Sequence, residues 1–330
     1  MSDYYELKRK IISKAALEKI PVVGEFELSP ACNFSCKMCY LAGKKDQGLK
    51  KAEWESIFNG AVNAGLLYGL LTGGEPFLCK DFPDFYNYLY DHGVRITIFT
   101  NGSLWPDYAL SLFMKKPPET IAITLYGGCE ETYEEVTKTK GSFAKVKRTI
   151  DNITDAGLPL ALRTIPLPEV YHDLDNIIAL AKGHNFVLGY TLYIAPDEHG
   201  HTPERLTAEQ LADFEKRICD AFPEAYRKSG KNKSDCAALK SGCYIDNQGF
   251  MRPCALLDMP KERLEPGRYL ETFRRLSTLW EEMSLCNECI TCEYVDGCIN
   301  CPASRCHEGD IKKCHEYLQN IARKRMHHEG

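Results

Sequence analysis

The sequence lacks any long apolar run and any excess of basic residues. No apolar run reaches the about 20 residues of a membrane span, and the first residues, Met1 to Tyr5, contain no apolar signal-peptide segment. The formal net charge is -5, whereas a general nucleic-acid binder has a basic excess. We therefore expect a cytoplasmic protein without a membrane span and without a nucleic-acid partner.

Internal repeats and low-complexity segments are also absent. The chain has 330 residues, 44% of them hydrophobic, which is enough for one barrel-sized domain and a smaller one. It contains 16 cysteines. Because the cytosol keeps thiols reduced, we expect metal ligands rather than disulfides.

Strand-like and helix-like patterns alternate between residues 22 and 195. Strands are predicted at 23–29, 67–72, 94–100, 120–126, 159–165 and 187–194, and helices between them include 51–66, 83–92 and 173–182. Successive strand–helix units predict a parallel sheet with helices outside. Six units are too few to close an eight-stranded barrel, so we predict an α/β fold with a partial (β/α)6 TIM-like barrel.

Four segments follow from these patterns. We predict an N-terminal helix in residues 1–21, the barrel in 22–196, a polar bridging helix (203–229) and a hydrophilic linker in 197–235, and a cysteine-rich unit with a C-terminal helix in 236–330.

Three cysteines, Cys32, Cys36 and Cys39, follow the first predicted strand with the spacing CxxxCxxC. Iron–sulfur clusters usually take four thiolates, so three leave one iron without a protein ligand. A zinc site with a distant fourth ligand uses similar spacings, and the spacing alone leaves both open. Gly73-Gly74-Glu75 follows the next strand. Paired glycines let the backbone approach a ligand closely, which favours the cluster.

The cysteine loop, with Phe34, Met38 and Tyr40, and the Gly-Gly-Glu motif resemble those of the radical SAM superfamily. The resemblance implies a 4Fe-4S cluster whose open iron binds S-adenosylmethionine (SAM), which is cleaved reductively to a 5′-deoxyadenosyl radical. It implies cofactor-binding roles for residues at the carboxyl ends of the strands. Gly73, Gly74 and Glu75 would bind the amino group of SAM, and Arg163 would bind its carboxylate. Tyr40 and Tyr193 would flank the adenine. Asn101 and Thr124 would lie near the ribose. An ordinary turn at Asn101-Gly102 and a surface ion pair at Arg163 remain open.

The C-terminal part is rich in cysteine and poor in aliphatic runs, so we expect metal to hold it together. It resembles the SPASM extension, which carries two auxiliary 4Fe-4S clusters. The resemblance implies that Cys236, Cys243, Cys254 and Cys301 hold the first and that Cys289, Cys292, Cys298 and Cys314 hold the second. Cys306 competes with Cys301 and Cys286 with Cys289, because the spacing departs from the family pattern. Two structural zinc ions are the alternative. If Cys236 or Cys243 is not a ligand, the first cluster has an open iron.

Two further cysteines lie in the barrel, Cys79 and Cys129. Buried free thiols are common, and this is the default interpretation for both. Cys129, at the end of the fourth strand, is also a candidate catalytic residue that donates a hydrogen atom to a substrate radical.

The resemblance implies a radical SAM oxidoreductase that modifies a ribosomally synthesised peptide, by an oxidative thioether or other crosslink or by epimerisation. Its partners would be the peptide and a flavodoxin- or ferredoxin-type reductant. About 25 residues before the first strand are too few for a winged-helix domain that grips a leader peptide, so a separate leader-recognition protein is expected. Alternatives are formylglycine formation in sulfatases or oxidation of a small molecule such as a tetrapyrrole. A non-catalytic iron–sulfur or zinc scaffold is the alternative from another class, and the Gly-Gly-Glu motif speaks against it.

Overall fold

Six parallel strands form the centre of the protein. The computed structural model describes residues 2–41, 48–197, 200–226 and 236–328. The strands are β1 Val23–Glu27, β2 Tyr68–Thr72, β3 Arg95–Thr100, β4 Thr120–Leu125, β5 Leu160–Thr164 and β6 Leu188–Tyr190. They neighbour one another in chain order. This confirms the predicted parallel sheet of a partial barrel; the predicted linker, residues 229–234, lies outside the described residues.

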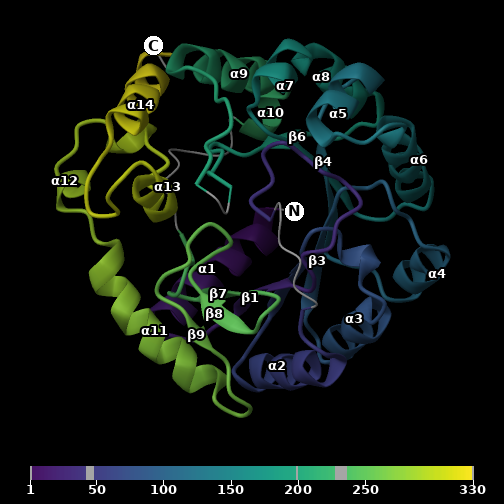
Figure 1. The fold of residues 1–330 in the computed structure, drawn as a ribbon, viewed down its shortest axis with the longest axis vertical. Coiled ribbons are helices and arrows are strands. Elements are labelled where there is room, and N and C mark those ends of the chain that lie inside the picture. Colours follow the sequence, from purple (N-terminus) through teal and green to yellow (C-terminus); the bar gives the residue numbers. More distant parts are fainter. Residues whose placement is uncertain (1, 42–47, 198–199, 227–235, 329–330) are drawn as a thin grey trace.

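Helices cover the outside of this sheet (Figure 1). They are α2 Lys51–Asn63, η1 Pro76–Leu78, α3 Phe82–Asp91, α4 Asp107–Lys115, α5 Glu130–Thr137, α6 Ser142–Asp155, α7 Pro168–His172, α8 Leu174–Gly183 and α9 Ala208–Ala221. Aromatic rings fix the layer at β1, where Phe26 packs edge-on against Phe58, with ring centroids 5.0 Å apart, and Phe58 stacks on Trp54. All three side chains are buried.

The alternation of side chains along β1 sets what lies inside the barrel. Because Phe26 faces the helices, its neighbours Glu25 and Glu27 point to the opposite side, the barrel lumen. The same alternation places Arg163 of β5 in the lumen, since Leu162 and Thr164 on either side of it are buried in the outer layer. The barrel interior is therefore charged.

Helix α1, Ser2–Glu18, lies across the amino ends of the strands. Lys8 Nζ contacts Glu119, just before β4, at 2.7 Å, and lies 4.2 Å from the ring centroid of Tyr68, the first residue of β2. Tyr4 Oη donates to the same Glu119 carboxylate. The helix thus covers the end of the barrel opposite the cysteine loop.

A hairpin between Cys243 and Cys254 joins the barrel sheet. Strand β7, Gly242–Ile245, pairs in parallel with the free edge of β1, from Val23↔Gly242 to Phe26↔Ile245. Strands β8 Phe250–Arg252 and β9 Glu262–Arg263 follow antiparallel. The result is one nine-stranded sheet.

The C-terminal helices fill the side of the molecule between β9 and α9 (Figure 1). They are α11 Tyr269–Ser284, α12 Asn287–Ile290, η2 Val295–Gly297, α13 Pro302–His307 and α14 Glu316–His328. Helix α14 packs beside α9, where Arg325 forms a two-pronged ion pair with Glu215 at 2.6 and 2.7 Å. Among the described residues, we find no helix whose length and apolar character would let it cross a membrane.

The bridging helix and the sixth strand are much shorter than predicted. The bridging helix starts only at Ala208, because Thr207 caps it by accepting a hydrogen bond from Gln210 N, and it ends before Pro223, which opens the separate helix α10, Pro223–Tyr226. Strand β6 covers 188–190 rather than 187–194. After Thr191 N donates to Thr164 O, pairing with β5 stops.

Candidate active site

The cysteine loop leaves the carboxyl end of β1 and is held against α5. Ser35 N donates to Thr137 O at 3.0 Å, and Lys37 N donates to Val136 O at 3.1 Å. The Lys37 side chain also pairs with Glu169 of α7. Burial raises the pKa of Cys36, and the nearby Cys39 and Cys32 thiols raise it further. Three thiols therefore lie close together on a fixed loop.

The paired glycines make room for this loop. A Cβ on Gly73, whose φ is +146°, would lie 2.4 Å from Ser29 O, and one on Gly74 would lie 2.3 Å from Ala31 O. Both contacts are far too short. We expected the glycines to let a ligand approach. In the structure, the backbone segment that leads to Cys32 lies against the glycines instead. Gly74 N donates a hydrogen bond to Ser29 O of this segment at 2.8 Å.

Glu75 is fully buried and joins the carboxyl ends of β2 and β3. Its carboxylate accepts hydrogen bonds from Thr100 Oγ1 at 2.8 Å, Asn101 N at 2.8 Å and Phe77 N at 3.1 Å. Burial raises the pKa of Glu75 to about 7, and the three donors oppose that rise. The carboxylate thus orders the backbone around the cysteine loop.

Asn101 is more than an ordinary turn residue. Its side chain is buried, and its Nδ2 donates to Asn33 Oδ1 at 2.9 Å and to Cys32 Sγ at 3.7 Å. Its Oδ1 accepts from Ser103 N at 2.8 Å. The side chain thus points at the cysteine loop.

Arg163 lies in the lumen rather than in a surface ion pair. Its guanidinium lies 4.7 Å from the ring centroid of Phe99, and its strand neighbour is Thr124, the other predicted residue on this wall. Burial lowers the pKa of Arg163. Burial also raises the pKa of Glu25, which faces it from β1, to about 7, against the attraction of Arg163. In the described part of the chain neither group has a hydrogen-bond or ion-pair partner.

Tyr40 lies beside the hairpin at the end of β1. Burial raises its pKa, and the nearby Glu27 carboxylate adds to the rise. Glu27 accepts a hydrogen bond of 2.5 Å from Tyr244 of β7, and Arg252 of β8 lies 3.7 Å from the same oxygen. The cysteine loop and the hairpin therefore meet at one buried carboxylate.

Tyr193 faces the C-terminal helices. Its Oη donates to Glu308 at 2.8 Å, and its ring stacks on His307 with centroids 6.3 Å apart. Arg205 pairs with the same carboxylate. The adenine contact implied by the family resemblance stays a prediction for this residue.

Four residues of this site were not predicted from the sequence: Glu25, Glu27, Tyr244 and Arg252. A signal existed for the first two. Parallel strands are buried on both faces and usually apolar, yet β1 carries two carboxylates two positions apart. That pattern indicates a lumen face with charge.

Three of the four cysteines expected at the first auxiliary cluster lie near one another. Burial raises the pKa of Cys254 to about 12, with the thiols of Cys301 and Cys236 adding to it. Cys243 points to the other side of β7, where its Sγ lies 3.2 Å from Tyr269 Oη of α11. The structure thus does not bring Cys243 to the other three, because its side chain packs against α11. The competitor Cys306 is exposed.

The second set forms a separate group. Burial raises the pKa of Cys314, and neighbouring thiols of Cys298 and Cys292 add to it. Cys289 Sγ lies 2.8 Å from Cys286 Sγ. Both competitors for one ligand position, Cys286 and Cys289, therefore lie in this group.

The remaining barrel cysteines have local surroundings. Cys129 precedes α5, with its Sγ 3.4 Å from Thr132 Oγ1, and its backbone N donates to Asp173. Burial raises the pKa of Cys79, just after η1. A catalytic role for Cys129 stays a prediction.

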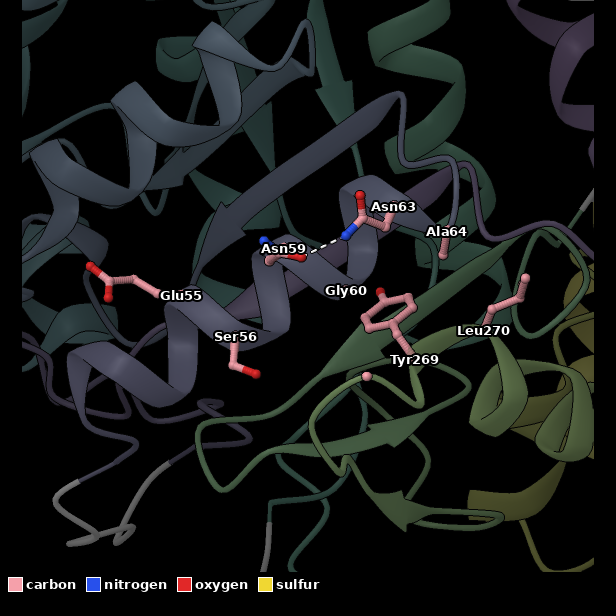
Figure 2. A pocket seen from close by; sticks show the side chains of 9 residues that line it. Glu55, Ser56, Asn59, Gly60, Asn63, Ala64, Tyr269 and Leu270 are labelled. Carbon is pink, nitrogen blue, oxygen red and sulfur yellow. Dashed lines mark hydrogen bonds between the residues drawn. The ribbon is translucent and has the colours of Figure 1, made fainter.

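Two hollows lie outside the barrel. One of about 520 Å³ lies between α2 and α11, with Asn59 and Asn63 on one wall and Tyr269 and Leu270 on the other (Figure 2). A second of about 410 Å³ adjoins it and shares Gly60 and Tyr269. Neither is lined by a residue of the cysteine loop.

The donor set fits an iron–sulfur cluster. Cys32, Cys36 and Cys39 offer thiol sulfur only, the ligand type of 4Fe-4S clusters. Across residues 2–41, 48–197, 200–226 and 236–328, no three His, Cys, Asp or Glu side chains are arranged around a single metal ion.

A partial barrel with a three-cysteine loop after its first strand and Gly-Gly-Glu after its second defines a class of SAM-dependent iron–sulfur enzymes. Residues 26–181 match the family model described as the Radical SAM superfamily. This part of the chain is a radical SAM domain, the domain of a superfamily of enzymes that use a 4Fe-4S cluster and SAM.

Curated relatives include a maturation protein, a bacteriocin biosynthesis protein and a heme synthase. The chain is 22% identical to the sporulation killing factor maturation protein SkfB of Bacillus subtilis, over 73% of this chain and 62% of that protein. It is 24% identical to the subtilosin biosynthesis protein AlbA of the same species, over 74% and 56%. It is 23% identical to the AdoMet-dependent heme synthase of Methanosarcina barkeri, over 87% and 93%. The aligned region therefore spans under two thirds of both maturation proteins.

Solved structures share the fold. SuiB of Streptococcus suis bound to S-adenosylmethionine superposes with a TM-score of 0.72 at 16% identity, covering 97% of this chain and 83% of that one. Native anSMEcpe with bound AdoMet also gives 0.72 at 16%, covering 93% and 96%.

Proposed function

We propose that this radical SAM enzyme oxidatively modifies a ribosomally synthesised peptide, forming a thioether or other crosslink, or epimerises one of its residues. The observation that carries the proposal is the pairing of β7 with β1. It places Cys236 and Cys254, on either side of the hairpin, next to the barrel that holds the cysteine loop. SkfB and AlbA, both named for peptide products, support the peptide class.

Cys32, Cys36 and Cys39 would hold the 4Fe-4S cluster, which with bound SAM would supply a 5′-deoxyadenosyl radical. The chain's own residues hold this site and shape the lumen. Glu75 and Asn101 fix the loop, while Glu25 and Arg163 present a carboxyl group and a guanidinium to a substrate inside the barrel. A carboxylate and a guanidinium on facing walls suit the amide or charged groups of a peptide. Helix α1 covers the amino ends of the strands and so keeps water out of that end of the barrel lumen.

We further propose that residues 236–330 form the auxiliary unit, with Cys236, Cys254 and Cys301 at one cluster and Cys289, Cys292, Cys298 and Cys314 at the other. With Cys243 turned toward Tyr269, the first cluster would have one iron without a cysteine ligand, and that iron could bind a substrate thiolate. A flavodoxin- or ferredoxin-type reductant, a separate leader-recognition protein and a cytoplasmic location complete the proposal.

A tetrapyrrole substrate is the second candidate. The alignment with the heme synthase covers 93% of that protein, more than those with the maturation proteins. It therefore favours a small-molecule oxidation as the alternative.

One anaerobic assay tests these proposals. Reconstituted enzyme receives SAM, a strong reductant and either the peptides encoded beside its gene or an iron coproporphyrin. Mass spectrometry then follows the products. Loss of two hydrogens per site in a peptide, with deoxyadenosine formed, supports crosslinking; deuterium uptake from heavy water without mass loss supports epimerisation. Turnover of the porphyrin alone contradicts the peptide proposal.

A further inference from the structure

The Asn101 carboxamide reaches the first ligand of the cysteine loop. Its Nδ2 lies 3.7 Å from Cys32 Sγ, within the range of a hydrogen bond to sulfur, and donates its other hydrogen to Asn33 Oδ1 at 2.9 Å. Cys32 Sγ also accepts from Phe34 N at 3.4 Å. One ligand sulfur thus receives two N–H donors, one of them from a side chain outside the loop.

The orientation of this amide is fixed by its partners. Asn101 Oδ1 accepts from Ser103 N at 2.8 Å and from Ser103 Oγ at 2.7 Å. Turning the amide over would set its NH2 group against the backbone N–H of Ser103. Amide orientation is assigned from such networks, and here the network requires the nitrogen to face Cys32.

The backbone of Asn101 is fixed as well. Its N–H donates to Glu75 Oε2 at 2.8 Å, and Gly102 N donates to Thr100 Oγ1 at 3.1 Å. Gly102 has a φ of +74°, which favours glycine. With the side chain buried and both ends bonded, Asn101 is a rigid donor.

We propose that Asn101 is a positioning residue for the cluster of Cys32, Cys36 and Cys39, and that its hydrogen bond to Cys32 Sγ raises the reduction potential of that cluster. Hydrogen bonds to the sulfurs are among the features that set the potential of an iron–sulfur cluster. A donor stabilises negative charge on sulfur, and that charge grows when the cluster takes one electron from a flavodoxin- or ferredoxin-type reductant. The donor therefore favours the reduced state.

This role differs from the ribose contact that the family resemblance implies for Asn101. Both polar atoms of the carboxamide are already engaged, Nδ2 with Cys32 and Asn33 and Oδ1 with Ser103. A ribose hydroxyl would have to displace one of these bonds. The inference uses the radical SAM domain alone and does not depend on the nature of the substrate.

The test compares wild type with Asn101→Leu, which keeps the size but has no donor, and Ser103→Ala, which keeps the donor but loosens its orientation. Electron paramagnetic resonance follows reduction of the holoenzyme at fixed potentials, and the signal that changes on adding SAM identifies the cluster. We expect Asn101→Leu to lower the equilibrium constant for its reduction roughly threefold to tenfold, as for loss of one hydrogen bond. Ser103→Ala should lower it by less.

SAM affinity, measured by equilibrium dialysis in the absence of reductant, separates the two roles. Unchanged SAM affinity with a lowered reduction constant supports the proposal. An unchanged reduction constant in both variants overturns it, and weaker SAM binding in that case assigns Asn101 to the ribose. If Asn101→Leu takes up no iron, the Ser103→Ala result decides: a lowered constant supports the proposal and a wild-type value overturns it.

Discussion

Tyr244 Oη donates a 2.5 Å hydrogen bond to Glu27 Oε2, although 217 residues separate the two in the chain. Both side chains are buried, and Arg252 adds a positive charge 3.7 Å from the same oxygen. The bond joins the strand that leads into the cysteine loop to the hairpin that leads to Cys254. The two cysteine regions are therefore coupled through one buried carboxylate.

We expect Tyr244→Phe to lower the free energy of unfolding by about 1 to 3 kcal/mol, because a buried carboxylate loses a hydrogen-bond donor. Thermal unfolding of the reconstituted protein under anaerobic conditions measures the change. Tyr5→Phe is the matched control, since Tyr5 is exposed, and should leave the midpoint unchanged. Equal midpoints for both variants would mean that the Tyr244 hydroxyl contributes nothing to stability.

Gly74→Ala should abolish iron binding at the cysteine loop. The added Cβ would lie 2.3 Å from Ala31 O, so the segment before Cys32 has to move. Iron content and deoxyadenosine formation from SAM are the measurements. Gly183→Ala, on α8 with open space around its Cβ position, is the control and should behave as wild type. Normal SAM cleavage by Gly74→Ala would refute the close packing of the two segments.

Replacing Cys243 and Cys236 separately tests the first auxiliary site. Cys243 faces Tyr269, so Cys243→Ala should keep the full iron content and lose only about 1 kcal/mol of stability. Cys236→Ala should lose about four iron atoms per chain, one cluster. Iron loss of equal size in both variants would show that Cys243 is a ligand after all.

Glu25 should contribute a fall in the free energy of unfolding as pH rises from 4.5 to 7. Burial raises the pKa of Glu25 from 4.5 to about 7, so the folded state binds its proton over this interval and the unfolded state does not. The contribution is at most about 3 kcal/mol. Its size is limited by Arg163, the facing charge. Denaturant unfolding of wild type and Glu25→Gln at pH 5 and 7.5 measures it.

The Glu25→Gln variant should lose less stability than wild type between these pH values. Comparing the two chains cancels the effects of all other titrating groups, including the cysteines. Parallel pH profiles would show that Glu25 is charged at both values and that Arg163 outweighs its burial.

Sequence patterns predicted the six strands, the helix layer and the loop of Cys32, Cys36 and Cys39, because these depend on local periodicity and spacing. The pairing of β7 with β1 could not be predicted, since it depends on which sheet edge is free. The direction of Cys243 depends on that pairing, and the contact between Asn101 and Cys32 depends on how β1 and β3 end side by side. The bridging helix is shorter than predicted because Thr207 caps its start and Pro223 follows its end.

The pairing between β1 and β7 also has a consequence for synthesis of the chain. At about 5 to 20 residues per second, roughly 10 to 40 s pass on the ribosome between Glu27 and Tyr244. During that time β1 presents an unpaired edge beside the cysteine loop, the kind of edge that invites pairing with other chains. A truncated barrel that ends before β7 keeps that edge open permanently. Expression of the barrel alone should therefore give aggregation rather than a smaller working enzyme.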